Sequence, residues 1–333
     1  MTFSLLPGWT ARDIPDLTGR RMVVTGANSG LGLVTARELA RKGATVVMTA
    51  RDETKGDEAV RRVRTDIGRQ VSVEAAVLDL ADLASVRAFA AVQVGHPVDV
   101  LVNNAGVMAV PPRLTADGFE LQMGTNHLGH FALTGLLLPA LLARPGSRVV
   151  SVSSFVHWFG SLDFGDLMSE RAYDPWTAYF RSKLANLLFM SELGRRAADA
   201  GADLVSVAAH PGHARTNLQH VGPQMAGRKT TEAVMRVGST LLGQSAATGA
   251  LPQLRAGTDP DVRPGDYFGP RGAAEQRGLP KRVRRSANAR DEKAAGILWE
   301  ISEELTGVSY RWPGQGQETE AEAGSPAPIT GPR

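Results

Sequence analysis

Residues 21–50 constrain the fold of this chain more than any other stretch. Residues 22–25 form a short apolar, β-branched run, which predicts a buried strand, and a glycine-rich turn follows from Gly26 through Gly30 to Gly32. A helical pattern leads from this turn into a second apolar run at 45–49. Strand, turn, helix and strand form a βαβ unit, whose glycines allow a tight turn and bring a helix N-terminus close to a pyrophosphate. The alternative is a βα turn that binds no ligand.

The end of the second predicted strand bears on the choice between two dinucleotides. NAD sites place an acid about 20 residues beyond the glycine turn for the ribose 2′-hydroxyl, whereas NADP sites use a nearby arginine for the 2′-phosphate. Ala50 and Arg51 occupy this position, and Asp52 is expected to cap the helix that follows at 53–65. The pattern predicts that NADP(H) is preferred over NAD(H). The alternative is that Arg51 is a solvated surface residue.

Apolar runs and helical patterns continue to alternate without a linker as far as residue 216. We expect further strands at 71–78, 98–102, 147–151 and 203–209, and helices at 81–92, 124–143 and 177–198. Such alternation predicts a single-domain, doubly wound parallel α/β sheet over residues 1–312. Its C-terminal extension includes an edge strand at 266–268 and helices at 231–242 and 289–306. Residues 313–333 are rich in glycine, proline and glutamate and are expected to be a disordered tail.

Composition removes several classes of protein from consideration. The chain has no cysteine, which excludes disulfides, thiolate catalysis and cysteine-ligated metals. A formal net charge of +3 gives no support for nucleic acid as a partner. The N-terminus lacks the basic start of a secretory signal, and the most apolar stretch, 128–143, is shorter than a membrane span requires. We therefore expect a cytoplasmic protein without a membrane span.

Two polar features have both a functional and a structural interpretation. His127 and His130 lie three residues apart, but no third ligand is near in sequence, so hydrogen-bonded helix histidines are expected rather than a metal site. The basic segment 277–290 suits an anion or an acidic partner. Because no aromatic residue interleaves its charges, a solvated loop is favoured.

Tyr179 and Lys183 stand four residues apart near the start of the helix expected at 177–198, so they share one face. A nearby ammonium favours the phenolate, and we expect Lys183 to lower the pKa of Tyr179 from its usual value of about 10. The pair would then act as a tuned proton donor. The pattern is weak by itself, since an ordinary amphipathic helix can carry it.

Small or polar residues follow several of the predicted strands. Asp79 ends the third strand, residues 103–106 read Asn-Asn-Ala-Gly after the fourth, and Ser154 follows the fifth. Ligands of parallel sheets gather at the carboxyl ends of the strands. The aromatic-rich loop 155–176 and the region of Tyr267 are expected to wall an apolar pocket, with the polar segment 217–230 as a flap.

Together these motifs resemble the short-chain dehydrogenases/reductases over residues 16–312. The chain looks most like the retinol-dehydrogenase-like reductases of that family, through the motifs at 48–51 (Met-Thr-Ala-Arg), 126–131 (Asn-His-Leu-Gly-His-Phe), 179–186 (Tyr-Phe-Arg-Ser-Lys-Leu-Ala-Asn) and 210–212 (His-Pro-Gly). The resemblance implies a Rossmann fold and an oxidoreductase that interconverts a carbonyl and an alcohol on an apolar small molecule. It also implies that hydride comes from the nicotinamide and the proton from Tyr179.

The resemblance gives individual residues a role. Tyr179 is the acid and base, and Lys183 lowers its pKa and binds the nicotinamide ribose. Ser154 hydrogen-bonds the substrate oxygen, and Asn126 supports a water that links Lys183 to solvent. The cofactor site comprises Tyr179, Lys183 and the remaining positions of the motif set: Gly26, Asn28, Ser29, Gly30, Leu31, Gly32, Arg51, Asp79, Leu80, Asn104, Ala105, Gly106, Pro211, Gly212 and Thr216. The implied reaction needs no metal.

Two questions have alternative answers at this point. The first concerns activity, because a non-catalytic NADP-binding regulator can use the same fold, although such proteins usually lose the tyrosine or the lysine. The second concerns assembly. The helices at 128–143 and 177–198 would form a homodimer interface, or the C-terminal segment would cover them.

Overall fold

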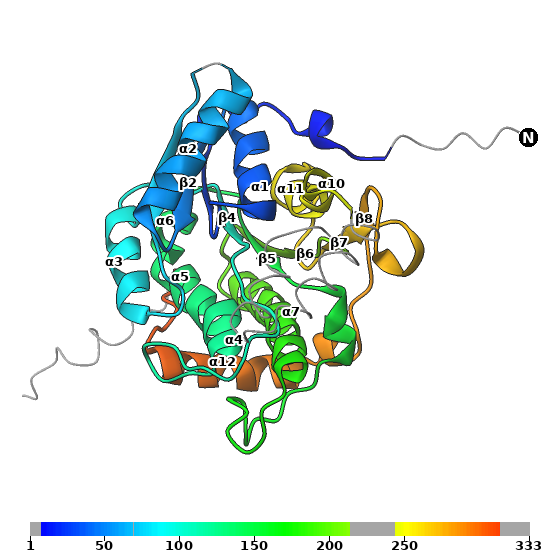
Figure 1. Cartoon of the computed structure of the whole chain (residues 1–333). Helices are drawn as coiled ribbons and strands as arrows, with labels where there is room; N and C mark the ends of the chain where they lie inside the picture. The colour runs from blue at the N-terminus through cyan, green and yellow to red at the C-terminus, as the bar shows by residue number, and fades with distance from the viewer. Residues whose placement is uncertain (1–7, 69, 214–243, 314–333) are drawn as a thin grey trace, which may run out of the picture.

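One parallel sheet organises the computed structural model, which describes residues 8–68, 70–213 and 244–313 (Figure 1). Within these residues the strand order is β3-β2-β1-β4-β5-β6-β7-β8, with β1 to β7 parallel and β8 antiparallel to β7. The strands are β1 Arg21–Val24, β2 Thr45–Ala50, β3 Val73–Val77, β4 Val100–Asn103, β5 Ser147–Val152, β6 Leu204–Ala209, β7 Tyr267–Pro270 and β8 Pro280–Arg282. The predicted doubly wound α/β sheet is confirmed.

The strands form where the sequence is apolar and β-branched. Met22, Val23 and Val24 of β1 are all buried, as expected for a strand that is covered on both faces. The strand order reverses beside β1, because β2 and β3 lie on one side and β4 and the later strands on the other. Val24 therefore pairs with both Met48 and Val102. The carboxyl ends of β1 and β4 meet at this switch point, where ligands of such sheets bind.

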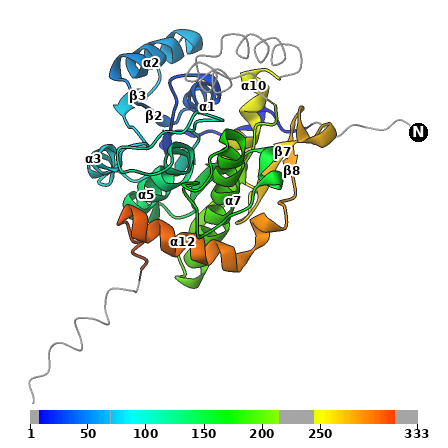
Figure 2. The same ribbon diagram turned by 60° about the horizontal axis from the view of Figure 1, so that its bottom comes forward.

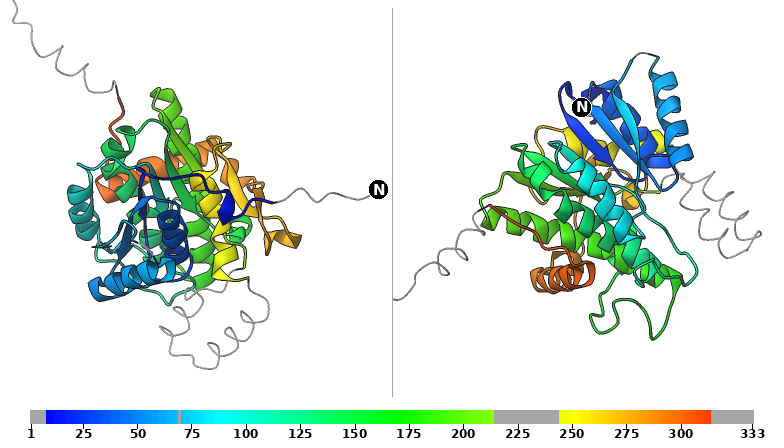
Figure 3. Two further views of the ribbon diagram at one scale, coloured as in Figure 1. Left: turned by 90° about the horizontal axis from the view of Figure 1, so that it is seen from above. Right: turned by 90° about the vertical axis from the view of Figure 1, so that its left-hand side faces the viewer.

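Helices cover both faces of the sheet (Figures 1 and 3). One face is packed by α1 (Gly30–Arg41), α2 (Glu53–Ile67) and α11 (Leu251–Thr258), and α10 (Ala246–Gly249) packs against α1 and α11. The other is packed by α3 (Leu83–Gln93), α5 (Gly129–Leu136), α6 (Leu138–Leu142) and α7 (Pro175–Asp199). The Asp52 carboxylate caps α2 as predicted, with the Lys55 N–H donating to its Oδ1 at 2.9 Å.

The continuous helix predicted at 124–143 was wrong, because this region is broken into shorter pieces. α4 (Leu121–Met123) leads into a π-helical turn, η2 (Gly124–Leu128), and α5 and α6 follow. In η2 the Gly129 N–H donates to Gly124 O, five residues back rather than four. Pro139 has no N–H to donate, and it stands in the first turn of α6. The π turn carries Asn126 and so falls on a residue of the predicted site.

The predicted C-terminal helix is confirmed as α12 (Glu292–Thr306), which lies along α7 (Figure 2). The buried Trp299 ring stacks on Phe189 of α7 at 5.9 Å between centroids and meets Phe131 of α5 edge-on at 5.0 Å. The Arg196 guanidinium lies 4.6 Å from the same indole ring. The C-terminal segment thus covers these helices, and a homodimer through this face would have to displace α12.

Two predictions for the C-terminal region were wrong. The strand at 266–268 is not an edge, because β7 pairs with β6 on one side and with β8 on the other. The basic segment is not simply a solvated loop, since β8 lies within it as the edge strand of the sheet. Arg282 of β8 bonds Asp266 at 2.9 Å, and the half-buried Arg285 guanidinium contacts Ser191. These arginines therefore have structural partners within the chain.

Several predictions lie outside the described residues: the helix at 231–242, the flap at 217–230, Thr216 and the tail from 314. Within the described ranges, no helix combines the length and the apolarity needed to cross a membrane. The single domain over 1–312 and the cytoplasmic location stay predictions.

Replacing Trp299 with alanine should lower the free energy of unfolding by about 3–5 kcal/mol, because the change empties a site packed between α5, α7 and α12. Urea unfolding followed by circular dichroism measures this loss. Leu305→Ala on the same helix is the matched control, since Leu305 is 36% exposed, and it should cost no more than about 0.5 kcal/mol. Similar losses in the two variants would contradict the packing described.

Candidate active site

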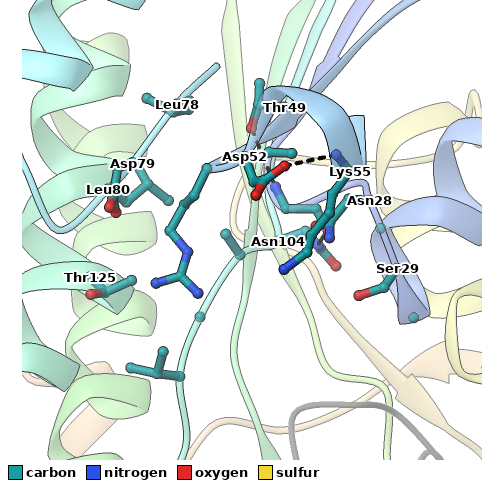
Figure 4. A pocket seen from close by; sticks show the side chains of 18 of the residues that line it. Asn28, Ser29, Thr49, Asp52, Lys55, Leu78, Asp79, Leu80, Asn104 and Thr125 are labelled. Carbon is teal, nitrogen blue, oxygen red and sulfur yellow. Dashed lines mark hydrogen bonds between the residues drawn. The ribbon is translucent and has the colours of Figure 1, made fainter. Parts of the chain in front are cut away.

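A cavity of about 340 Å³ opens at the carboxyl ends of β1 and β4, where the strand order reverses (Figure 4). Most of the residues predicted to bind the cofactor line it: Gly26, Asn28, Ser29, Gly30, Leu31, Gly32, Arg51, Asp79, Leu80, Asn104, Ala105 and Gly106. It is also lined by residues that the sequence did not single out for the site: Thr49, Ala50, Asp52, Lys55, Leu78, Val107 and Thr125. The sheet thus brings strand ends that are distant in the sequence into one cavity.

The glycine turn depends on residues without a side chain. Gly26 and Gly30 have φ values of +62° and +55°, in the left-handed region that other residues rarely adopt. A Cβ at Gly26 would also lie 2.9 Å from the Cβ of Ala105, and a Cβ at Gly32 would lie 2.7 Å from Asn104 Nδ2. Glycine is therefore needed both for the turn and for the close approach of the loop after β4.

The N-terminus of α1 is open to a negatively charged ligand. Ser29 is its N-cap but makes no side-chain hydrogen bond to the helix, and the first turn contains no acidic residue. The first residues of α1, Gly30 to Gly32, line the cavity. Backbone N–H groups at a helix N-terminus and the helix dipole together favour a phosphate. The geometry here suits the pyrophosphate of a dinucleotide.

The Thr25 hydroxyl joins the glycine turn to the loop after β4. Its Oγ1 accepts hydrogen bonds from the backbone N–H groups of Asn104 at 2.8 Å and Ala105 at 2.9 Å. In the opposite direction, Asn104 Nδ2 donates to the backbone oxygen of Thr25 at 2.7 Å. These bonds hold two walls of the cavity at a fixed separation.

Two cations stand on the β2 side of the cavity, Arg51 and Lys55. The nearby Asp52 carboxylate is engaged as the cap of α2 (Figure 4). Sequence reasoning found Arg51 but missed Lys55. The signal was available, because Lys55 falls in the first turn of the helix predicted to begin at residue 53, just beyond the strand end that carries Arg51.

Tyr179 and Lys183 are brought together on the inner face of α7, as predicted. Both are buried, with only 5% and 3% of their surfaces exposed. Lys183 Nζ lies 5.7 Å from the centroid of the Tyr179 ring and donates to Val152 O, at the end of β5, at 3.2 Å. Ser154, two residues beyond β5, lies beside the Tyr179 hydroxyl and favours its ionised form. The end of β5 and the residues just after it therefore contact both Lys183 and Tyr179.

Burial controls the protonation of this pair. It raises the pKa of Tyr179 to about 12, although the hydrogen bond with Ser154 lowers that pKa in part. It lowers the pKa of Lys183 to about 8. The expected net lowering of the tyrosine pKa was therefore wrong for this chain, because loss of hydration raises the pKa by more than Ser154 lowers it. Tyr179 is protonated at neutral pH, and Lys183 remains largely charged below pH 8.

Asn126 connects the cavity to the tyrosine–lysine pair. Its Oδ1 accepts from the Val107 N–H at 2.8 Å, and its Nδ2 donates to Val107 O and to Ser182 Oγ, both at 2.9 Å. A Cβ at Gly106 would lie 2.9 Å from Asn126 Oδ1 and 3.5 Å from Lys183 Nζ. Gly106 lines the cavity, so the ammonium lies just behind the cavity wall.

The remaining predicted residues follow β6. Gly212 has a φ of +62°, and its N–H donates to His210 Nδ1 at 3.2 Å, while Pro211 O accepts from Gln244 Nε2 at 2.6 Å. Neither Pro211 nor Gly212 lines the cavity. The predicted hydrogen-bonded histidines are confirmed, since His127 Nε2 lies 2.9 Å from Ser302 Oγ and His130 bonds both Asn126 and Thr25.

The switch-point cavity, the glycine turn and the buried tyrosine–lysine pair together define a dinucleotide-dependent oxidoreductase. The model of the short chain dehydrogenase family matches residues 20–226. The chain belongs to the short-chain dehydrogenase/reductase family, in its retinol-dehydrogenase-like branch.

Individual relatives agree with this assignment. Retinol dehydrogenase 14 of Mus musculus is 41% identical over 304 residues, which cover 87% of this chain and 86% of that protein. A crystal structure of an uncharacterized protein from Mycobacterium Paratuberculosis is 47% identical, with a TM-score of 0.77, over 92% of this chain and 100% of that chain. An NAD(P) dependent gluconate 5-dehydrogenase from Beutenbergia cavernae with bound NADP is 27% identical, with a TM-score of 0.56, over 76% and 95%.

These findings establish the class of reaction. The protein is an oxidoreductase that acts on an alcohol or a carbonyl group of a small molecule and uses a nicotinamide cofactor.

The lowered pKa of Lys183 predicts a pH limit to activity. Because the ammonium is present below about pH 8 and lost above it, kcat/KM for NADPH should fall as pH rises through about 8. Initial rates between pH 6 and 10, at saturating carbonyl substrate, measure the profile. A value of kcat/KM that stays constant up to pH 10 would show that Lys183 keeps its ordinary pKa of 10.5.

Proposed function

We propose that the protein is an NADP(H)-dependent reductase of apolar carbonyl compounds, and dehydrogenase of the matching alcohols, with Tyr179 as the proton donor. One observation carries this proposal. A buried tyrosine, beside Ser154 and close to Lys183, lies next to a cavity that suits a dinucleotide. This arrangement supports a reaction in which a proton from Tyr179 and a hydride from a bound cofactor reach the same group.

The proposed proton transfer follows from the surroundings of Tyr179. Its raised pKa keeps the phenol protonated at neutral pH, which is the form needed to protonate a carbonyl oxygen during reduction. Ser154 Oγ accepts a long hydrogen bond from the Val156 N–H at 3.4 Å, so its own hydrogen is available for the tyrosine oxygen or for the charge that develops on the substrate. When bound, the nicotinamide cofactor supplies the hydride.

Lys183 and Asn126 have supporting roles in this proposal. Once the proton has left Tyr179, the Lys183 ammonium stabilises the phenolate, and it also binds the nicotinamide ribose. Asn126 holds the loop at Val107 against Ser182, the neighbour of Lys183, and supports a water that links the ammonium to solvent. In alcohol oxidation the proton moves in the opposite direction, so Tyr179 must first be a phenolate. The free-energy cost of burying that charge therefore matters most for oxidation.

The preference for NADP(H) over NAD(H) is supported by charge. Arg51 and Lys55 present two cations to the part of the cavity that follows β2, and Ala50 places no carboxylate there. Asp52, the acid nearest to this position, accepts the Lys55 N–H and is thereby engaged. A 2′-phosphate would bind the two cations, whereas a 2′-hydroxyl would leave them without an anionic partner.

The proposal of an apolar substrate is supported by a chain of aromatic rings that ends at Tyr179. The Trp176 ring meets the Tyr179 ring edge-on, with 6.4 Å between centroids, and is tilted against the Phe180 ring at 6.0 Å. The Phe159 centroid lies 5.8 Å from that of Phe180. Trp176 and Phe159 are 39% and 66% exposed. The name of the mouse relative, retinol dehydrogenase 14, indicates an apolar alcohol for that protein. A non-catalytic role has no support, since the whole proposed catalytic set is present.

Tyr179→Phe should reduce turnover of apolar aldehydes by about 10²–10⁴-fold, because the general acid is lost, while NADPH still binds. Oxidation of NADPH followed by absorbance, with NADPH binding by fluorescence, measures the two effects separately. Tyr310→Phe is the control, since it removes a buried hydroxyl that donates to Phe131 O at 2.7 Å, and neither residue lines the cavity. Turnover unchanged in Tyr179→Phe would end the assignment of the acid.

Arg51→Asp should weaken NADPH binding by about ten- to a hundredfold and improve NADH binding, because a charge-assisted contact with the 2′-phosphate is replaced by a carboxylate. Lys55→Ala should weaken NADPH alone. Isothermal titration measures the affinity of each variant for NADPH and for NADH, for comparison with the wild type. Arg62→Ala, an exposed cation on α2 that does not line the cavity, is the control and should alter neither. If the ratio of the NADPH affinity to the NADH affinity were unchanged in both Arg51→Asp and Lys55→Ala, these two residues would not determine the choice of cofactor.

A further inference from the structure

His130 lies buried between the two parts of the active site. It is in the first turn of α5, and only 2% of its surface is exposed. Its Nδ1 is 3.0 Å from Asn126 O, and its Nε2 is 2.9 Å from Thr25 Oγ1. One ring therefore spans from the catalytic region, at Asn126, to the strand end that begins the glycine turn, at Thr25.

The partners of the ring determine where its hydrogens are. A carbonyl oxygen can only accept, so Nδ1 carries the hydrogen and donates it to Asn126 O. In a neutral imidazole Nε2 is then an acceptor, and the Thr25 hydroxyl donates to it. Val102 O is a poorer acceptor for this hydroxyl, at 3.3 Å against 2.9 Å.

The hydroxyl of Thr25 is then fully used. Its hydrogen goes to His130, and its oxygen accepts the N–H groups of Asn104 and Ala105. If the ring carried a second hydrogen, at Nε2, that hydrogen would point at Thr25 Oγ1, which already accepts two hydrogen bonds. Burial keeps the ring neutral, since it lowers the pKa of His130 to about 4, and the charge of Lys183 acts in the same direction, as does any charge on the neighbouring His127.

The other end of the ring acts on the π-helical turn η2. Asn126 lies within this turn, and its side chain holds Val107 and Ser182. The His130 side chain hydrogen-bonds the backbone carbonyl of Asn126. The ring thus fixes the backbone from which the Asn126 side chain extends, at a place where the helix departs from regular α geometry.

We propose that His130 is a positioning residue with two separate duties: through Nε2 it orders the Thr25-centred wall of the cofactor cavity, and through Nδ1 it orders Asn126 beside Lys183. The first duty rests on the geometry of the cavity. The second rests also on the proposed function, because it requires that Asn126 serves proton transfer. Neither duty involves contact with the substrate.

Two substitutions separate the duties, because each keeps one of the two bonds. The amide nitrogen of asparagine takes the place of Nδ1, so His130→Asn keeps the donor to Asn126 O and loses the acceptor for Thr25. The amide oxygen of glutamine takes the place of Nε2, so His130→Gln keeps the acceptor for Thr25 and loses the donor to Asn126. Each lost bond leaves a buried polar group without its partner.

The expected result is a split between binding and turnover. His130→Asn should raise the Kd for NADPH by about tenfold and leave kcat at saturating NADPH within about twofold of wild type. His130→Gln should lower kcat by about tenfold and leave the Kd for NADPH within about twofold. NADPH fluorescence gives Kd, and initial rates give kcat. If the two variants shift Kd and kcat alike, or shift neither, His130 has no such double role.

His127→Asn and His127→Gln are the matched controls. His127 is also a buried helix histidine, but it bonds Ser302 of α12 and not the site. These controls should lower the thermal unfolding midpoint without any split between Kd and kcat. The same split in the controls would overturn the proposal, because it would then reflect general loosening of the helix.

Variants of Thr25 test the first duty from its other side, and they serve if the His130 variants fold poorly. Thr25→Ser keeps the hydroxyl and should retain the Kd for NADPH, whereas Thr25→Val should raise it by about tenfold. Thr25→Val also removes the acceptor for the Asn104 and Ala105 N–H groups. Adding His130→Asn to Thr25→Val should therefore raise Kd no further than Thr25→Val alone, since the bond between the two residues is already lost. Additive effects would contradict the link. Failure of the proposed function is distinguishable, because Tyr179→Phe would then retain turnover while the Kd measurements still report on Thr25 and His130.

Discussion

The close approach between the glycine turn and the loop after β4 is the contact on which the site depends. Gly26 allows it by having no side chain, and the Thr25 hydroxyl fixes it by accepting two backbone N–H groups of the loop. β1 and β4 are neighbours because the strand order reverses between them, so this contact brings the N-terminus of α1 and Gly106 to the same cavity. Behind Gly106 lie Asn126 and Lys183, so the cavity and the tyrosine–lysine pair share one wall.

Burial determines what the tyrosine–lysine pair can do. In water a phenol and an ammonium would have pKa values near their ordinary ones, and a close approach of the cation would lower the pKa of the phenol. In this chain α7 presses both groups against β5, and loss of hydration keeps the phenol protonated and makes the ammonium easier to discharge. The folded protein therefore keeps Tyr179 protonated at neutral pH, which is the form that the proposed reduction requires. α12 covers the outer side of α7 and so completes the layer that carries the pair.

The sequence was sufficient where the signal is local. Each strand of the parallel sheet is a short apolar run, and the glycine turn and the Asp52 cap depend on neighbouring residues, so all could be predicted. The break at η2, the pairing of β8 and the reversed pKa of Tyr179 depend on packing between distant segments, which no local pattern reveals. Lys55 was missed for another reason, because only the helical geometry after Arg51 brings it to the cavity.

The central claim is that the nicotinamide cofactor transfers a hydride to the carbonyl carbon of an apolar aldehyde. Transfer of deuterium measures it most directly. The enzyme is incubated in ordinary water with an apolar aldehyde and NADPH that carries deuterium at the transferring position of the nicotinamide ring, and the alcohol is examined by mass spectrometry. The account predicts one deuterium atom, bound to the former carbonyl carbon. An alcohol without deuterium, or no alcohol from any apolar aldehyde, would contradict it.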